Sequence, residues 1–236
     1  MTTLTLAFVL TFLAGITTPF GALISSNKTL HSFCLRHEVD SFILYFGGGA
    51  LLAAIALVLL PYGLEHNSVA GAIIAFLSGS LLLWQIDVYL KKKGNPASLF
   101  LGLLLDFIPE SIVLGAMMTA NPKTGYLLAM LIALQNMPEG FSASTEMREG
   151  GLSAKKIWFL FLSVPLVGPL SAWIGYSWLA GNNSILGLLC LFCSGGILYL
   201  IFDDIAPNAH MKNHDFPAIG AVLGFLLGMV GTMMIH

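Results

Sequence analysis

Two short stretches decide the fold: Asp106-Phe107-Ile108-Pro109-Glu110-Ser111 and Gln135-Asn136-Met137-Pro138-Glu139-Gly140. They are two copies of one pattern, offset by twenty-nine positions, and each lies near the middle of a long apolar run. In each copy a polar residue precedes a glutamate by four positions, so both side chains share one face of a helix. The proline before each glutamate cannot donate to the carbonyl four residues back, which leaves the Leu105 and Leu134 oxygens free. The pattern predicts an oxygen-rich pocket inside an apolar body.

The composition is that of a membrane protein. Of the 236 residues, 57% are hydrophobic and 9% are charged, whereas a soluble domain carries about 25% charged residues. Apolar runs of about 20 residues recur, each long enough to cross the bilayer as a helix. They are too long and too continuously apolar for membrane-spanning strands. We therefore predict an all-α polytopic membrane protein, a bundle of eight transmembrane helices near residues 3–25, 42–62, 69–90, 98–119, 126–147, 157–180, 184–207 and 216–235.

The basic residues predict the orientation of the chain. Nine of the ten Lys and Arg residues fall at the odd-numbered connections, and Lys123 alone lies on the other side. Because cytoplasmic loops carry an excess of Lys and Arg, we expect both termini outside. The first span lacks a preceding positive residue and is too long for a signal peptide, so we expect it to be retained. The prediction is a single transmembrane domain over residues 1–236, in the cell (inner) membrane.

Small residues predict close helix packing and a weak internal repeat. Gly220, Gly224 and Gly228 form a stripe on the last span that lets another backbone approach closely. Residues 49–61 on the second span and 195–207 on the seventh share a Gly-to-Pro spacing of twelve. Because these spans cross in opposite directions, the spacing indicates either an inverted-topology repeat, as in transporters, or a coincidence.

Charge balance at the centre of the bundle points to a cation. With the fourth and fifth spans antiparallel, Asp106 should lie near the level of Glu139, and Glu110 near the level of Gln135. A charge at the bilayer centre costs about 2.5–3.5 kcal/mol, and every Lys and Arg lies at a span end or in a connection. The carboxylates must therefore share protons or meet a cation from outside the chain. The alternative is that they are neutral groups that hydrogen-bond between helices.

The donor atoms alone do not select one metal. Carboxylate, amide and carbonyl oxygens suit Mg²⁺, Mn²⁺ or Fe²⁺, whereas Zn²⁺ prefers His and Cys but accepts carboxylate. None of the six His residues lies inside a span, so the residues favour the harder ions. Cys190 and Cys193 share a face of the seventh span, where a buried cysteine is usually a small hydrophobic residue. Their role stays open.

At these residues the chain resembles the ZIP (Zrt/Irt-like) family of divalent metal transporters. The family's fourth span carries a His-Asn-x-Pro-Glu-Gly pattern and its fifth a related Pro-Glu pattern, which residues 135–140 match well. The likeness extends to eight spans with both ends outside. The resemblance implies alternating access, with Glu110 and Glu139 as central metal ligands. The full set of candidate metal ligands is Asp106, Glu110, Gln135, Asn136 and Glu139.

The chain also departs from the family pattern. The family's His in the fourth span is Asp106 here, and its following Asn is Phe107. Asn136 stands where an acidic residue is common, and Gly168 stands where some bacterial members keep a Glu. These differences remove most ligands of a second, adjacent metal site, so we expect one central site.

The predicted function is transport of divalent cations of the Zn, Fe and Mn class between the fourth and fifth spans. The metal is the substrate, and we expect no permanently bound cofactor, no catalytic residue and no nucleic-acid partner. The expected surroundings are the lipid bilayer, and a homodimer is one option. The alternatives are a proton pathway, a metal sensor without flux, or an intramembrane enzyme. The enzyme is the weakest alternative, because the repeated Pro-Glu pair would then have no role.

Several polar residues at span ends are lesser candidates. Glu65 and His66 lie at the predicted outer mouth, and Asp87 with Lys91 has the spacing of an ordinary helix-end pair. A second group of polar residues is expected on the cytoplasmic side. These residues either form an exit path for the cation or are ordinary hydrated residues at helix ends: Glu146, Asp203, Asp204, His210, His214 and Asp215.

Overall fold

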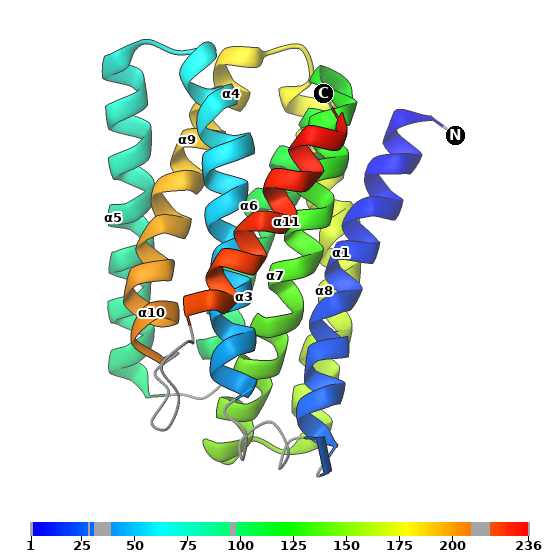
Figure 1. Cartoon of the computed structure of the whole chain (residues 1–236), viewed down its shortest axis with the longest axis vertical. Helices are drawn as coiled ribbons and strands as arrows, with labels where there is room; N and C mark the ends of the chain where they lie inside the picture. The colour runs from blue at the N-terminus through cyan, green and yellow to red at the C-terminus, as the bar shows by residue number, and fades with distance from the viewer. Residues whose placement is uncertain (1, 28, 31–38, 95–97, 209–217, 236) are drawn as a thin grey trace.

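The computed structural model describes residues 2–27, 29–30, 39–94, 98–208 and 218–235. All regular structure in these ranges is helical. The helices run up and down as one bundle, with both termini at the same end (Figure 1). The elements are α1 (Thr3–Ser26), α3 (Val39–Ala54), η1 (Ile55–Leu59), α4 (Leu60–Glu65), α5 (Val69–Lys93), α6 (Ser98–Ala120), α7 (Pro122–Glu149), α8 (Ala154–Ile174), η2 (Gly175–Leu179), α9 (Asn183–Leu200), η3 (Ile201–Ile205), α10 (Ala206–Asn208) and α11 (Ala218–Ile235), where η marks a π-helical turn.

Within the described residues, seven helical segments are long and apolar enough to cross a membrane. They are Thr3–Ser26, Val39–Glu65, Val69–Lys92, Phe100–Ala120, Ala154–Leu179, Asn183–Asp203 and Ala218–Ile235. The eighth crossing is α7, which is 28 residues long but carries the polar residues of the 135–140 stretch. This helix packs against α1, α3 and α6, so its polar side chains face protein rather than lipid. The predicted helical membrane bundle is confirmed.

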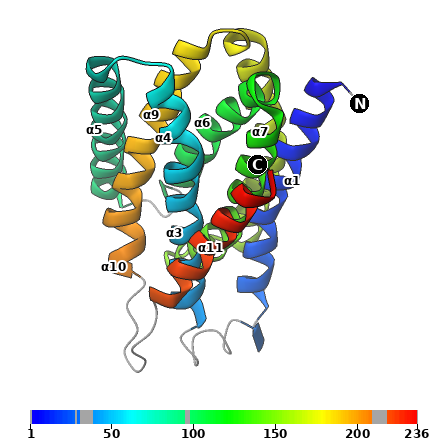
Figure 2. The same ribbon diagram turned by 45° about the horizontal axis from the view of Figure 1, so that its top comes forward.

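We divide the helices into two groups of four, which are in extensive contact with each other. One group contains α1, α6, α7 and α8, and the other contains the segments α3 to α4, α5, α9 and α11. Figure 2 shows α11 beside α3, and α9 between α5 and the second span. The groups meet where α7 packs on α3 and where α6 packs on α9.

The tightest helix pairs meet at glycines. A Cβ atom added to Gly79 of α5 would overlap the Phe192 carbonyl oxygen of α9, and one added to Gly195 of α9 would overlap the Phe76 carbonyl oxygen of α5. Helices in lipid associate mainly by such close van der Waals packing. The same reciprocal contact occurs in α1 with α7 at Gly21 and Gly140, in α6 with the continuous segment of α8 and η2 at Gly115 and Gly175, and in α3 with α11 at Gly49 and Gly224. The predicted glycine stripe of α11 is thus buried against α3.

The second and seventh spans share an irregularity at the same place. A π-helical turn occupies Ile55–Leu59, six residues after Gly49, and another occupies Ile201–Ile205, six residues after Gly195. In both spans a proline follows two residues after the turn and interrupts the α-helical hydrogen bonds. The pairing also matches, since α3 packs on α11 as α9 packs on α5. These correspondences favour the inverted repeat over coincidence.

The outer surface of the bundle is apolar. On α5 the exposed side chains include Ile73, Ile74 and Leu81, and on α11 they include Val222 and Met233. A continuous apolar surface of this kind suits the hydrocarbon of a bilayer and would cause association in water. The chain is an integral membrane protein.

Replacing Gly79 with alanine tests the glycine contacts. We expect Gly79→Ala to lower the free energy of unfolding by about 1–3 kcal/mol, because the added methyl group must push α9 away. The thermal melting temperature of the purified protein in detergent measures this effect. Gly102→Ala is the matched control, since no atom lies within 4 Å of a Cβ at that helical position. Equal melting temperatures for Gly79→Ala and the wild type would contradict the packing.

Candidate metal site

The central site joins α6 to α7 through one amide and two carboxylates. Gln135 Nε2 donates a hydrogen bond to Glu110 Oε2 at 2.7 Å and lies 3.5 Å from Asp106 Oδ2. Because α6 and α7 run antiparallel, Glu110 and Gln135 meet at one level, as the spacing predicts. A single side-chain amide therefore bridges the two carboxylates.

These bridging residues are enclosed by the protein. Glu110 and Gln135 have no exposed surface, and Asp106 is 5% exposed. In the part of the chain that the structure describes, Glu110 Oε1 and Gln135 Oε1 are buried without a hydrogen-bond partner. Leaving a buried polar atom unpaired costs about 1–3 kcal/mol. Two acceptor oxygens of the site are thus available to a positively charged ligand.

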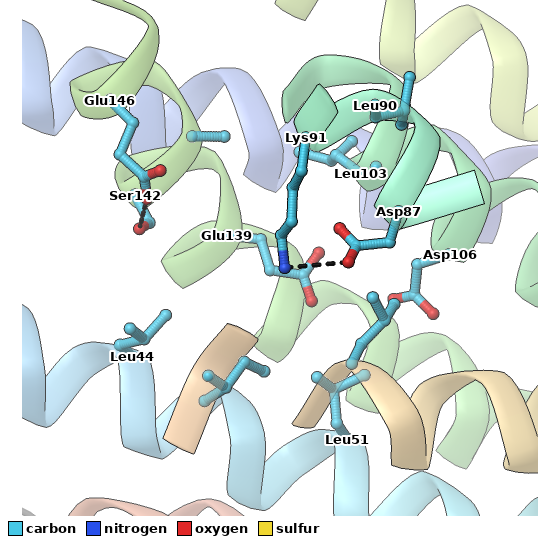
Figure 3. Close-up of a pocket in the computed structure, with 14 residues that line it drawn as sticks. Leu44, Leu51, Asp87, Leu90, Lys91, Leu103, Asp106, Glu139, Ser142 and Glu146 are labelled. Atoms are coloured by element: carbon cyan, nitrogen blue, oxygen red, sulfur yellow. Dashed lines mark hydrogen bonds and ion pairs between the residues drawn. The ribbon is translucent and has the colours of Figure 1, made fainter. Parts of the chain in front are cut away.

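Glu139 lies on a cavity that leads to the predicted cytoplasmic end. The cavity has a volume of about 180 Å³, and its lining includes Asp106, Glu139, Ser142 and Glu146 (Figure 3). Exposure rises along α7, from the buried Gln135 through the partly buried Glu139 to the exposed Glu146. The cavity therefore connects the level of Asp106 with the end of the bundle where α7 finishes.

The opposite side of the site is filled by apolar side chains. Leu114 and Met117 of α6 and Leu128 and Ile132 of α7 have no exposed surface. Because α6 ends and α7 begins at the end of the bundle that carries both termini (Figure 1), these residues lie between that end and the central site. The central site therefore adjoins a cavity toward one end of the bundle, and these apolar side chains, the apolar plug, close it toward the other end.

Asn136 points to a different neighbour than Gln135 does. Its Nδ2 donates a hydrogen bond to the Ala14 carbonyl oxygen of α1 at 3.0 Å. Its Oδ1 is buried and has no hydrogen-bond partner among the described residues. The structure therefore brings Asp106, Glu110 and Gln135 together, places Glu139 on the adjoining cavity, and ties the Asn136 amide nitrogen to α1.

An ion-pair network lies at the mouth of the cavity. Lys91 Nζ lies 2.9 Å from Asp87 Oδ2 and 2.5 Å from Asp203 Oδ2. The Tyr199 hydroxyl donates to Asp87 Oδ2 at 2.9 Å. Asp87 and Lys91 line the same cavity as Glu139 (Figure 3). The four-residue spacing predicts the Asp87–Lys91 pair, but the contact with Asp203 of η3 depends on how α5 and α9 pack.

The other polar candidates lie apart from the central site. His66 Nδ1 donates to the Tyr62 carbonyl oxygen at 2.9 Å, and its ring stacks on Tyr62 with centroids 4.4 Å apart. These local contacts favour the interpretation of His66 as a helix-end residue. His210, His214, Asp215 and the side chain of Asp204 lie outside the described residues.

The donor set is a mixed one. Among the described residues, no three His, Cys, Asp or Glu side chains form a group that could hold a metal ion. A cation at the level of Gln135 would therefore meet carboxylate oxygens together with an amide oxygen. Oxygen ligands of this kind bind Mg²⁺, Mn²⁺ and Fe²⁺ readily, and Zn²⁺ also accepts carboxylate.

Fold and site define a class of protein: a polytopic helical membrane protein with buried carboxylates beside an internal cavity. No family model matches the chain. The chain is 32% identical to the zinc transporter GufA of Myxococcus xanthus over 144 residues, which cover 60% of this chain and 57% of GufA. It is 25% identical to the zinc transporter ZupT of Chlorobium phaeovibrioides and to that of Streptococcus mutans, with 97% of each chain covered. These relatives confirm the resemblance to the ZIP transporters.

Removing the bridging amide tests the electrostatic role of Gln135. We expect Gln135→Met to destabilise the protein by about 1–3 kcal/mol, because Glu110 loses its donor while staying buried. Thermal melting in detergent measures the change. Gln85→Met is the control, since Gln85 is exposed on α5. If the two variants melt at the same temperature, the bridge does not stabilise the fold.

Proposed function

We propose that the protein transports divalent metal cations across the membrane. The observation that carries the proposal is the buried pair Asp106 and Glu110, joined by Gln135 and placed beside a cavity that leads to one end of the bundle. The names of the relatives, which are zinc transporters, support cation transport and make Zn²⁺ the first candidate. Fe²⁺ and Mn²⁺ are further candidates, because the donors are mainly oxygen atoms.

The ligand roles follow from which atoms are free. Glu110 Oε1 and Gln135 Oε1 are unpartnered and buried, so they are the first donors to a bound cation. Asp106 supplies a second carboxylate, and Glu139 supplies a third on the cavity side. A divalent cation offsets the charge of these groups, and protons do so when the cation leaves. Asn136 contributes by holding α7 against α1, and its unpartnered Oδ1 is an additional donor.

A single central site is supported by the surroundings of Phe107. Its side chain is 1% exposed, and its Cζ atom would lie 3.0 Å from a Cβ atom added to Gly168. The backbone oxygen of Thr11 would lie 2.8 Å from the same Cβ. An aromatic ring therefore occupies the region where Gly168 and Phe107 replace ligands of the family pattern. There is little room for a second ion beside the first.

Alternating access requires that the cavity close and that the apolar plug open. The cavity is lined by Asp106 and Glu139 from one helix group and by Leu51 and Lys91 from the other. A movement of one group against the other would therefore change access without breaking the glycine contacts inside each group. The distribution of Lys and Arg supports an orientation in which the cavity opens toward the cytoplasm.

Neutralising single carboxylates tests the proposed transport site. Glu110→Gln and Glu139→Gln should each abolish saturable Zn²⁺ uptake into proteoliposomes, because each removes a charged ligand while keeping the shape of the side chain. Glu149→Gln, at the exposed end of α7, should transport like the wild type. Unchanged uptake in both site variants would exclude this site. A wild type without saturable metal uptake would instead favour a proton pathway or a sensor.

Cysteine labelling tests the direction in which the cavity opens. Ser142 lines the cavity, so Ser142→Cys should react with a membrane-impermeant maleimide from the cytoplasmic side, and Zn²⁺ should slow the reaction. Ser144 lies on the same helix but is buried against Ser25 of α1, so Ser144→Cys should stay unlabelled. The wild type gives the background from native cysteines. Labelling of Ser142→Cys from the outside alone would reverse the proposed orientation.

A further inference from the structure

A small void beside the central site brings α6 and α9 together. Its volume is about 10 Å³, which is close to the space that one water-sized sphere fills, about 10–15 Å³. Asp106 and Pro109 of α6 and Cys193 and Gly196 of α9 are among the residues that line it. Asp106 also lines the large cavity, so this residue forms a wall common to both spaces. The void has the size of a single ion and adjoins the route of the proposed substrate.

We propose that Cys193 is a further ligand of the transported metal and that its sulfur biases the site toward soft divalent cations such as Zn²⁺ and Cd²⁺. The inference rests on the proposed transport function and adds a donor from α9 to the oxygen donors of α6 and α7. None of the five predicted ligands contains a sulfur atom.

The surroundings of the void supply polar partners for a cation. The carboxylate residue Asp106 lines the void, and only 5% of its surface is exposed. Pro109 has no N–H for the carbonyl of Leu105, and both residues line the void. A cation in the void would thus lie between Cys193 and Asp106, which offer a sulfur atom and a carboxylate.

Coordination chemistry gives the consequence of a sulfur ligand. Cys193 is free of any disulfide and 5% exposed. A thiolate binds Zn²⁺ at about 2.3 Å and favours it over Mg²⁺ or Mn²⁺. On binding, the S–H bond is replaced by a metal–sulfur bond, and the proton leaves through the water-accessible cavity beside Asp106. A single cysteine would therefore shift an oxygen site from harder to softer ions.

Cys190 provides an internal comparison. It lies on α9 one turn before Cys193 and has no exposed surface. Its carbonyl oxygen accepts a hydrogen bond from the Ser194 hydroxyl, and Cys190 is not among the described residues that line the void. Its surroundings are those of a packing residue in the second helix group. The two cysteines of one helix thus have different neighbours, and Cys190 is a matched control.

Cadmium titration of the full-length protein tests the inference. A Cys34→Ser background is used, because Cys34 is the third cysteine of the chain and its thiol is another ligand for Cd²⁺. Cd²⁺ should produce a thiolate-to-metal charge-transfer band in the ultraviolet for this parent and for Cys190→Ala. Cys193→Ala and Cys193→Ser should lose the band and should weaken Zn²⁺ binding relative to Mn²⁺ binding by about tenfold. Cys193→Ser keeps the side-chain volume, and size-exclusion chromatography shows that each variant is folded.

The outcomes separate this inference from the proposed function. A band that persists in Cys193→Ser, or an unchanged ratio of Zn²⁺ to Mn²⁺ affinity, overturns the role of Cys193 while leaving transport intact. A parent protein that shows no saturable metal uptake in proteoliposomes overturns the proposed function. In that case the titration still decides whether Cys193 binds metal, because the titration requires no transport.

Discussion

The rest of the structure depends on how the buried carboxylates of α6 are stabilised, and the hydrogen bonds from Gln135 supply part of that stabilisation. Asp106 and Glu110 are buried in a bundle with an apolar outer surface, and the middle of α6 and of α7 carries no basic residue. An uncompensated charge at this depth costs about 2.5–3.5 kcal/mol. The Gln135 amide stabilises the carboxylates in part by donating hydrogen bonds to them. Glu110 Oε1 and Gln135 Oε1 have no hydrogen-bond partner among the described residues and can accept a ligand. A proton or a divalent cation completes the balance.

The two helix groups are relevant to the proposed alternating access. Glycine contacts join α1 to α7 and α6 to α8 in one group, and α3 to α11 and α5 to α9 in the other, so that each group is closely packed. The cavity lies between the groups and ends beside the Lys91 ion pairs. The oxygen donors belong to the first group, whereas Lys91 and Cys193 belong to the second. If the protein transports cations as proposed, a relative movement of the groups would change which of these side chains a cation meets.

Much of the fold followed from the sequence because lipid imposes simple rules on it. Long apolar runs and the placement of Lys and Arg give the spans, and the repeated Pro-Glu pattern gives the level of Glu110 and Gln135. What the sequence did not give depends on rotations of helices about their own axes. A span such as α9 is apolar all round, so its periodicity cannot show that Cys193 faces Asp106 or that Asp203 reaches Lys91. The direction of the Asn136 amide toward α1 has the same origin. The ligand roles of the five predicted residues stay a prediction.

Anomalous scattering from crystals grown with Zn²⁺ or Cd²⁺ tests the central claim most directly, because it locates the metal without reference to activity. The account predicts a peak between α6 and α7, with carboxylate oxygens of Glu110 and either Asp106 or Glu139 at about 2.0–2.2 Å from a bound Zn²⁺. Metal peaks confined to the ends of the bundle, with Glu110 still bonded only to Gln135, would contradict it.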